Sequence, residues 1–287
     1  MNHSSGQSLA PLFLIGAISA AAVVAPFPGY AASLITGLGG LQGYGEGELA
    51  ANDDSSTGSL LLPFAVNFFG TTYTSFFVNN NGNISFGAPV GSFTPSAFPG
   101  SSTPIIAPYW ADVDTSNQPG GGQVFYNIDD PSTLAVTWSK VGYFSDHNNK
   151  LNDFQLVMYN KGGGNFDAEF RYAQLQWTTG DASGGSNGLG GTPALAGYDS
   201  GNGTDFAILP GSLSASVLEL VNTSNSSPSI PGLYQFSVRN GTPEVPPGTG
   251  VPGPFPLLGV AAAFGYSRKL RKRIKGSKSL SLTGAFD

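Results

Sequence analysis

The chain has 287 residues, of which 40% are hydrophobic and 12% aromatic, enough apolar side chain to bury a core. Only 10% of the residues are charged, and the 41 Gly and 21 Pro argue against long helices. The sequence contains no cysteine, which excludes disulfides and thiolate metal sites. A eukaryotic extracellular module of this size would more often contain some, which favours a bacterial origin.

Charge is distributed unevenly along the chain. Residues 32–250 hold 17 acidic and five basic residues, whereas residues 251–287 hold seven basic residues and one acid. An acidic domain repels phosphate backbones, so the composition argues against nucleic acid as a partner. Cations or neutral sugars fit this charge better.

The first 31 residues have the pattern of a secretion signal. An uncharged apolar run, Leu9–Ala25, is followed by two prolines and a stretch of small residues. We predict a helical signal peptide over residues 1–31, with its cleavage region at Ala31 and Ala32. The run is preceded by no Lys or Arg, unlike the usual pattern, and the alternative is a buried helix of the domain.

Residues 60–240 alternate short aromatic and β-branched runs with Gly, Asn, Ser and Pro clusters, which is typical of strands joined by turns. We predict an all-β fold, a single antiparallel β-sandwich-like domain, with residues 32–59 as its lead-in. Asn81-Gly82 fits a type I′ hairpin turn, and Gly162–Gly164 is expected to join another pair. The predicted strands are Leu60–Phe68, Thr72–Asn79, Asn83–Phe86, Ile105–Asp112, Gln123–Asn127, Leu134–Val141, Asp153–Asn160, Phe166–Tyr172, Ala194–Tyr198 and Leu233–Val238.

Three stretches of this region resemble the nidogen-like (NIDO) domain. They are Asn67–Phe86 (NFFGTTYTSFFVNNNGNISF), Ile106–Asp114 (IAPYWADVD) and Ala194–Ser212 (ALAGYDSGNGTDFAILPGS). The resemblance covers roughly 180 residues and implies a module of extracellular matrices and adhesive surfaces. No catalytic residues are established for this family, so the resemblance supplies none.

Two groups of oxygen-bearing side chains are candidate ligands for Ca²⁺, which takes six to eight oxygen ligands from flexible loops. Asp112 and Asp114 are two apart and would share one face of a strand, where Asn79, Asn80 and Asn81 could approach from the neighbouring hairpin. The second group is Asp199, Asn202 and Asp205. The alternative is that these residues form turns by bonding to their own backbone.

Aromatic residues offer a second kind of binding chemistry. Tyr109, Trp110, Trp138 and Trp177 could stack on sugars if exposed, although packing in the core is the common role of aromatics in strands. The loops Ser139–Asn149 and Gly180–Gly191 are the expected binding face.

Residues suited to catalysis are few. His147 lies in a polar, turn-like stretch and is predicted to be an exposed loop residue. Ser186 lies in Gly184–Gly188, which matches the nucleophile-elbow string without the strand-turn-helix context that the motif requires. We therefore predict that the protein is not an enzyme, and the one cofactor it is a candidate to bind is Ca²⁺.

The C-terminal region has three parts in a fixed order. A Pro/Gly linker over residues 241–250 leads to Val251, Pro252, Gly253 and Pro254, and then to the apolar segment Phe255–Tyr266. That segment has 12 residues, fewer than the 17–25 or so that span a membrane. A cluster of basic residues that would stop translocation follows it, namely Arg268, Lys269, Arg271, Lys272, Arg273 and Lys275.

This order of motif, short apolar helix and basic cluster over residues 251–275 resembles the PEP-CTERM sorting signal, in the cyanobacterial form with Val-Pro-Gly-Pro. The resemblance implies cleavage by an exosortase-type transpeptidase after transient insertion in the inner membrane. Gly253 replaces the usual Glu, and the polar tail 276–287 is longer than in the common form. The alternative is a basic tail that binds anionic lipid or nucleic acid.

These features together predict an exported structural or adhesion protein of the cell surface or of an exopolysaccharide matrix, whose partner is a polysaccharide or a matrix protein. The first alternative is a calcium-dependent, lectin-like module with outward aromatics beside a calcium loop. The second is a hydrolase, which would need paired carboxylates or a base beside a serine.

Overall fold

The computed structural model describes Met1 and residues 32–244, and within this range the regular structure is almost entirely β. All paired strands in it are antiparallel, as the predicted fold class requires. Two short 3-10 helices, Asp181–Ser183 and Ala215–Val221, are the helical elements of the described residues. The predicted signal peptide and sorting segment lie outside this range.

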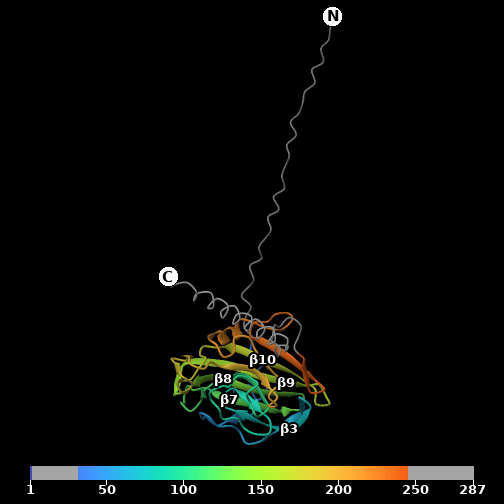
Figure 1. Ribbon diagram of the computed structural model, residues 1–287, viewed down its shortest axis with the longest axis horizontal. Coiled ribbons are helices and arrows are strands. Elements are labelled where there is room, and N and C mark those ends of the chain that lie inside the picture. The colour runs from blue at the N-terminus through green and yellow to red at the C-terminus, as the bar shows by residue number, and fades with distance from the viewer. Residues whose placement is uncertain (2–31, 245–287) are drawn as a thin grey trace, which may run out of the picture.

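The larger sheet has eight strands in the order β1-β7-β8-β9-β10-β15-β16, with β6 pairing β8. In Figure 1, β7, β8, β9 and β10 run side by side across the molecule. The strands are β1 (Gly47–Leu49), β6 (Val113–Asp114), β7 (Gln123–Asp130), β8 (Thr133–Tyr143), β9 (His147–Asn160), β10 (Phe166–Gln174), β15 (Leu233–Arg239) and β16 (Thr242–Glu244).

The smaller sheet has six strands in the order β14-β13-β5-β4-β3-β2, and a separate pair is formed by β11 and β12. The six strands are β2 (Leu60–Phe68), β3 (Thr71–Asn79), β4 (Asn83–Ser85), β5 (Ile105–Trp110), β13 (Leu195–Asp199) and β14 (Phe206–Ile208). The pair consists of β11 (Gly185–Ser186) and β12 (Leu189–Gly190).

One hydrophobic core joins the two sheets. It takes Phe76 and Ile84 from the smaller sheet and Trp138 and Phe154 from the larger one, and all four side chains are fully buried. The rings of Trp138 and Phe154 stack with centroids 5.2 Å apart, and Tyr109 of β5 packs on Phe154 at 5.4 Å. Because such aromatic contacts link both sheets, the sandwich is expected to fold as one unit.

The lead-in, residues 32–59, is part of the folded structure. Strand β1 pairs with β7, and Leu49 is buried in the core. Further upstream, Gln155 of β9 bonds both the amide and the carbonyl of Ile35, at 2.8 and 3.0 Å. The lead-in is therefore held against the larger sheet by backbone and side-chain hydrogen bonds.

The hairpin between β3 and β4 differs from the prediction. Asn79 pairs with Asn83, so the loop has three residues, and only Gly82 among them has a positive φ, 77°. A type I′ turn needs positive φ at two central residues, so that prediction is wrong. Gly82 is required for another reason as well, since a Cβ there would lie 1.8 Å from the carbonyl oxygen of Tyr109.

Two segments predicted as loops contain strands. β9 begins at His147, which pairs with Tyr143 of β8, so His147 is a strand residue and not the predicted loop residue. The segment predicted as linker begins with β16, which pairs with β15. The Gly162–Gly164 turn between β9 and β10 is as predicted, with all three glycines at positive φ.

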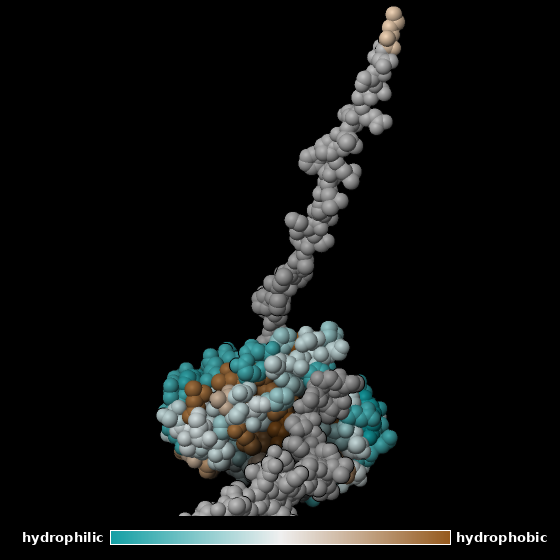
Figure 2. Space-filling model, turned by 45° about the horizontal axis from the view of Figure 1, so that its top comes forward, coloured by the Kyte–Doolittle hydropathy of each residue, from teal (hydrophilic) through white to brown (hydrophobic). Residues whose placement is uncertain are grey.

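Few large hydrophobic side chains of the described residues are exposed. Figure 2 shows one face, on which hydrophilic residues border smaller hydrophobic areas. The most exposed large hydrophobic side chains of residues 32–244 come from four separate segments and are Leu41, Leu61, Leu189 and Ile230. Within residues 32–244, no helix has the length and apolar character needed to cross a membrane.

Candidate cation site

Three aspartates meet beside the β3–β4 hairpin. Asp112 follows β5 in the bend that leads to β6, while Asp53 and Asp54 come from the segment between β1 and β2. Each offers one carboxylate oxygen, and these three oxygens lie within 4.8 Å of one another. This set, Asp53, Asp54 and Asp112, is called the acidic cluster below.

The acidic cluster contains carboxylate oxygens that are buried and unpaired. Asp112 is only 2% exposed, and its Oδ2 has no hydrogen-bond partner. Asp53 Oδ1 is likewise buried without a partner. In the described part of the chain the ion pairs involve other acids, namely Asp167, Glu169 and Asp181. Because a buried carboxylate without a partner is costly, these oxygens need a proton or a cation.

Burial and the repulsion of neighbouring charges both raise the pKa values of buried Asp112 and half-buried Asp53. Burial, followed by the charges of neighbouring aspartates, raises the pKa of Asp112 to about 7. The same causes in the same order raise the pKa of Asp53 to about 6. The neighbours are Asp53, Asp54, Asp114 and Asp181 for Asp112, and Asp54, Asp114 and Asp146 for Asp53.

The hairpin asparagines hold the two acidic segments together. Asn80 Nδ2 donates to the carbonyls of Asp53 and Val113, at 2.5 and 2.6 Å. Asn81 Nδ2 donates to Asp54 Oδ1 at 2.8 Å, and its Oδ1 accepts from the Val113 amide at 2.9 Å. Asn80 and Asn81 therefore hold Val113, next to Asp112, and the lead-in acids by hydrogen bonds, whereas Asn79 bonds Asn83 and Ser85 of its own hairpin.

Gly180 forms one wall of the acidic cluster. A Cβ at this position would lie 2.4 Å from Asp112 Oδ2, closer than any side chain can tolerate. Gly180 has an ordinary extended backbone, φ −79° and ψ 165°, so the lack of space for a side chain is what requires glycine here.

Asp114 lies near the acidic cluster, but its oxygens are occupied by the protein. Its Oδ1 accepts from the amide and hydroxyl of Ser116 at 2.9 and 2.5 Å, and its Oδ2 accepts from the Asp146 amide at 3.0 Å. This pattern is that of an Asx turn, which organises the loop after β6.

The structure does not bring Asp199, Asn202 and Asp205 to the acidic cluster. Asp199 is fully buried and accepts from the amides of Gly100, Ser101 and Gly201 at 3.1, 3.1 and 2.8 Å. Asn202 Oδ1 accepts from the amides of Thr204 and Asp205, and its Nδ2 donates to Asp205 Oδ2 at 2.6 Å. Their oxygens stabilise turns, the alternative considered from the sequence.

The aromatic side chains considered for sugar stacking are buried. Tyr109, Trp138 and Trp177 are 0% exposed and Trp110 is 3% exposed. Their polar atoms are used inside the fold, since Trp138 Nε1 donates to the Asn80 carbonyl at 2.9 Å and Tyr109 Oη to the Trp177 carbonyl at 2.8 Å. The outward aromatics expected of a lectin-like face are not these four residues.

The residues considered for catalysis lie in other surroundings. The side chain of His147 is 40% exposed, and its Nε2 lies 3.0 Å from Asp181 Oδ2. Ser186 is an exposed residue of β11, in a two-stranded hairpin and not on a strand-to-helix turn. Neither residue has the geometry of an activated nucleophile and its base.

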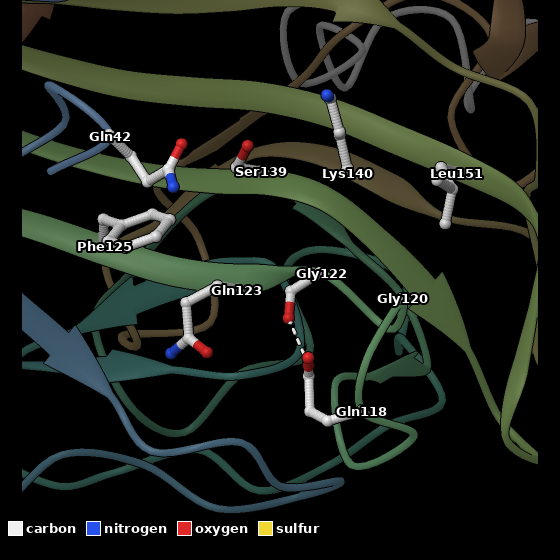
Figure 3. Close-up of a pocket in the computed structure, with 9 residues that line it drawn as sticks. All are labelled: Gln42, Gln118, Gly120, Gly122, Gln123, Phe125, Ser139, Lys140 and Leu151. Carbon is white, nitrogen blue, oxygen red and sulfur yellow. Dashed lines mark hydrogen bonds between the residues drawn. The ribbon is translucent and has the colours of Figure 1, made fainter.

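A shallow pocket of about 310 Å³ lies over β7 and β8 (Figure 3). Gln42, Gln123, Phe125 and Lys140 line it, together with Gln118, whose Nε2 donates to the Gly122 carbonyl at 2.7 Å. The pocket offers amides and one ammonium group, but the acidic cluster has the more defined chemistry.

The sequence prediction missed Asp53 and Asp54. They belong to the lead-in, whose sequence has no strand pattern that would predict its position against the sheets. The only signal in the sequence is the adjacent pair of acids within Asn52–Ser55. Distant segments meet at a site through tertiary structure, and a single sequence does not display that proximity.

The sandwich and the sequence together define the class of this protein. The family model for the nidogen-like domain matches residues 74–134 and 127–240. These matches cover more than half of the chain and include most strands of both sheets. The chain therefore belongs to the nidogen-like domain family, as its motifs predicted.

Known proteins of several animals are similar to this chain. Mouse alpha-tectorin is 34% identical over 226 residues, covering 69% of this chain and 10% of its own length. The Drosophila melanogaster nidogen is 28% identical over 216 residues, which cover 66% of this chain and 16% of the nidogen. The Caenorhabditis elegans dendrite extension defective protein 1 is 27% identical over 202 residues, which cover 62% of this chain and 16% of that protein.

The chain thus spans between 10% and 16% of the length of these relatives. No solved structure matches it.

Proposed function

We propose that this protein is an exported structural or adhesion component of a cell surface or extracellular matrix. The observation that carries the proposal is membership of the nidogen-like domain family, together with the similarity to alpha-tectorin and nidogen. The chain covers only 10% of alpha-tectorin and 16% of nidogen, so the proposal concerns the role of this module. Its partner would be a matrix polysaccharide or a matrix protein.

The route to the surface is the second part of the proposal. A signal peptide directs export, and the C-terminal segment pauses in the inner membrane until an exosortase-type transpeptidase cleaves near Val251–Pro254. Support comes from the order of motif, 12-residue apolar segment and basic cluster in the sequence.

The proposed route is tested by intact-mass analysis of the protein purified from a host strain with its transpeptidase and from a strain lacking it. We expect a shortened C-terminus only in the first strain. A mass that includes Asp287 in both strains would contradict the processing step and leave the adhesion role to be tested separately.

The adhesion role is tested by deleting the gene and measuring how firmly cells remain attached to their matrix under shear. Complementation with the full chain should restore attachment, whereas a chain with its core disrupted by Trp138→Asp should not. Equal attachment in the deleted and complemented strains would contradict the role.

The calcium-dependent lectin remains a separate candidate because the acidic cluster is a potential calcium site, although the four aromatics proposed to bind sugar are buried. A glycan array read with and without chelator distinguishes it from the adhesion module. Absence of glycan binding in both conditions would reject it.

A further inference from the structure

We propose that Asp53, Asp54 and Asp112 bind one Ca²⁺ ion, which fastens the segment between β1 and β2 to the end of the sandwich. The proposal concerns a property of the fold and does not depend on the matrix role. Its test and the tests of the proposed function can therefore fail independently.

The first argument is the unpaired, buried carboxylate. Asp112 is only 2% exposed, and its Oδ2 accepts no hydrogen bond. One oxygen of its carboxylate lies within 4.8 Å of an oxygen of Asp53 and of Asp54. Asp53, a second member of the acidic cluster, also has a buried oxygen without a partner, Oδ1. Unpaired, buried oxygens on two of three carboxylates that lie this close together are what an unfilled cation site would show.

The second argument is charge. Three carboxylates converge, and in residues 32–244 the nearest acids, Asp114, Asp146 and Asp181, add further negative charge to the surroundings. The Lys and Arg side chains that form ion pairs in this range are bound to Asp167 and Glu169 instead. A divalent cation would offset a repulsion that no side chain of the described region neutralises.

The third argument is preorganisation. The peptide carbonyl of Asp53 is held by Asn80, the carboxylate of Asp54 by Asn81, and the bend containing Asp112 by both asparagines through Val113. Asparagines that orient ligating segments in this way reduce the conformational entropy lost when an ion binds. The hairpin therefore acts as a positioning element for the acidic cluster.

The ligand chemistry favours Ca²⁺ among the common ions. The cluster supplies carboxylate oxygens only, from loops, which suits a hard cation that tolerates irregular geometry and fills its shell with water and carbonyl oxygens. Zn²⁺ is drawn to nitrogen and sulfur, and Mg²⁺ demands a regular octahedron.

The test uses the full-length chain, freed of metal with EGTA and titrated with CaCl₂ by isothermal calorimetry, with thermal unfolding measured in parallel. At Ca²⁺ about 100 times its Kd we expect one bound ion and a rise in Tm of about 5–10 °C. MgCl₂ at the same concentration is expected to give a much smaller rise. No heat and no rise in Tm at 10 mM Ca²⁺ would overturn the proposal.

Asp112→Asn is the decisive variant because it keeps the shape of the side chain and removes its charge. In EGTA its Tm should equal or exceed that of the wild type, since a buried unpaired charge has been removed, and Ca²⁺ should no longer raise it. The matched control Asp205→Asn, an exposed acid bonded within its own turn, should respond to Ca²⁺ like the wild type.

Two further outcomes decide between alternatives. If Asp112→Asn responds to Ca²⁺ as strongly as the wild type, the ion binds elsewhere and the proposal is wrong. If only protonation stabilises the carboxylates, the wild type gains stability at low pH but not with Ca²⁺, which also overturns it. Should Asp112→Asn not fold, Asp54→Asn replaces it as the variant that must lose the Ca²⁺ response. Binding can then also be followed by Tb³⁺ luminescence sensitised by Trp138, which donates a hydrogen bond to the carbonyl of Asn80.

Discussion

At the scale of single residues, position 180 requires glycine because there is no room for a side chain beside Asp112. Its neighbour Asp112 Oδ2 leaves no room for a methyl group, because a Cβ would approach it to 2.4 Å. We expect Gly180→Ala to displace the Asp112 carboxylate, to lower the free energy of unfolding by about 1–3 kcal/mol, and to abolish the response to Ca²⁺.

Urea denaturation with and without Ca²⁺ measures both effects. Gly58→Ala is the matched control, because a Cβ there meets no atom within 4 Å and its stability should change by less than about 0.5 kcal/mol. An unchanged Ca²⁺ response in Gly180→Ala would show that Asp112 is not a ligand.

Asp167 is a carboxylate whose pKa is lowered, in contrast to that of Asp112. Burial alone would raise its pKa, but hydrogen bonds from Arg239, Ser237 and Lys161 outweigh burial and hold the pKa below its usual value. The group therefore stabilises the fold above its unfolded pKa, and this stabilisation is lost as pH falls through the lower folded pKa.

We expect Asp167→Asn to cost about 1 kcal/mol or less at pH 6, since the carboxylate is partly solvated, and to cost nothing once the pH is low enough to protonate it. Urea midpoints of wild type and variant from pH 6 to pH 2 measure the difference. A gap between the two that stays constant over this range would contradict the assignment.

At the scale of elements, the β3–β4 hairpin connects the lead-in, the β5–β6 bend and the larger sheet. Asn80 donates to Asp53 and Val113 carbonyls, while its own carbonyl accepts from Trp138 of β8. Asn80→Asp would replace a donor by a charged acceptor facing those carbonyls, without changing the size of the side chain.

We expect Asn80→Asp to lower the free energy of unfolding by about 3 kcal/mol or more, because a buried charge is left without a partner. The same exchange at exposed Asn148 should cost less than about 0.5 kcal/mol. Similar losses from both variants, compared by urea denaturation, would mean that the hairpin bonds contribute little.

The same elements show what a single sequence reveals. β2 has the predicted bounds, and the predicted ends of interior strands such as β8 and β10 lie within two residues of the observed ends. These strands were predictable because their aromatic and β-branched residues are buried in the core between the sheets. β1 and β16 were missed. They have three residues each and are defined by backbone pairing with β7 and β15 and not by a side-chain pattern.

The candidate site divides in a similar way. Asp112 was identified from its sequence neighbourhood, whereas Asp53 and Asp54 reach it from about 60 residues away through hydrogen bonds of the hairpin. Asp199, Asn202 and Asp205 look like ligands in the sequence, but turns use the same residue types for their own backbone amides. The sequence alone does not distinguish a metal ligand from a turn-forming residue. The structure does, because a turn-forming carboxylate is hydrogen-bonded, whereas Asp112 has a buried oxygen without a partner.

At the scale of the whole molecule, the sandwich carries a large negative charge. Residues 32–250 hold 17 acids against five bases, so the folded domain is under repulsion that extends beyond the acidic cluster. Screening acts over about 10 Å at 0.1 M salt, which makes the stability of the wild type dependent on ionic strength. This general effect has to be separated from binding at one site.

The two effects predict different responses of the same pair of proteins. In EGTA, raising NaCl from 20 to 500 mM should increase the Tm of wild type and Asp112→Asn by a similar few degrees, since screening acts on all exposed charges. Added CaCl₂ at 1 mM hardly changes ionic strength, so it should raise the Tm of the wild type alone. Equal Ca²⁺ responses in both proteins would mean that the acidic surface attracts the ion diffusely. A response confined to the wild type would assign the Ca²⁺ effect to Asp112, and with it to the contact between the lead-in and the sandwich.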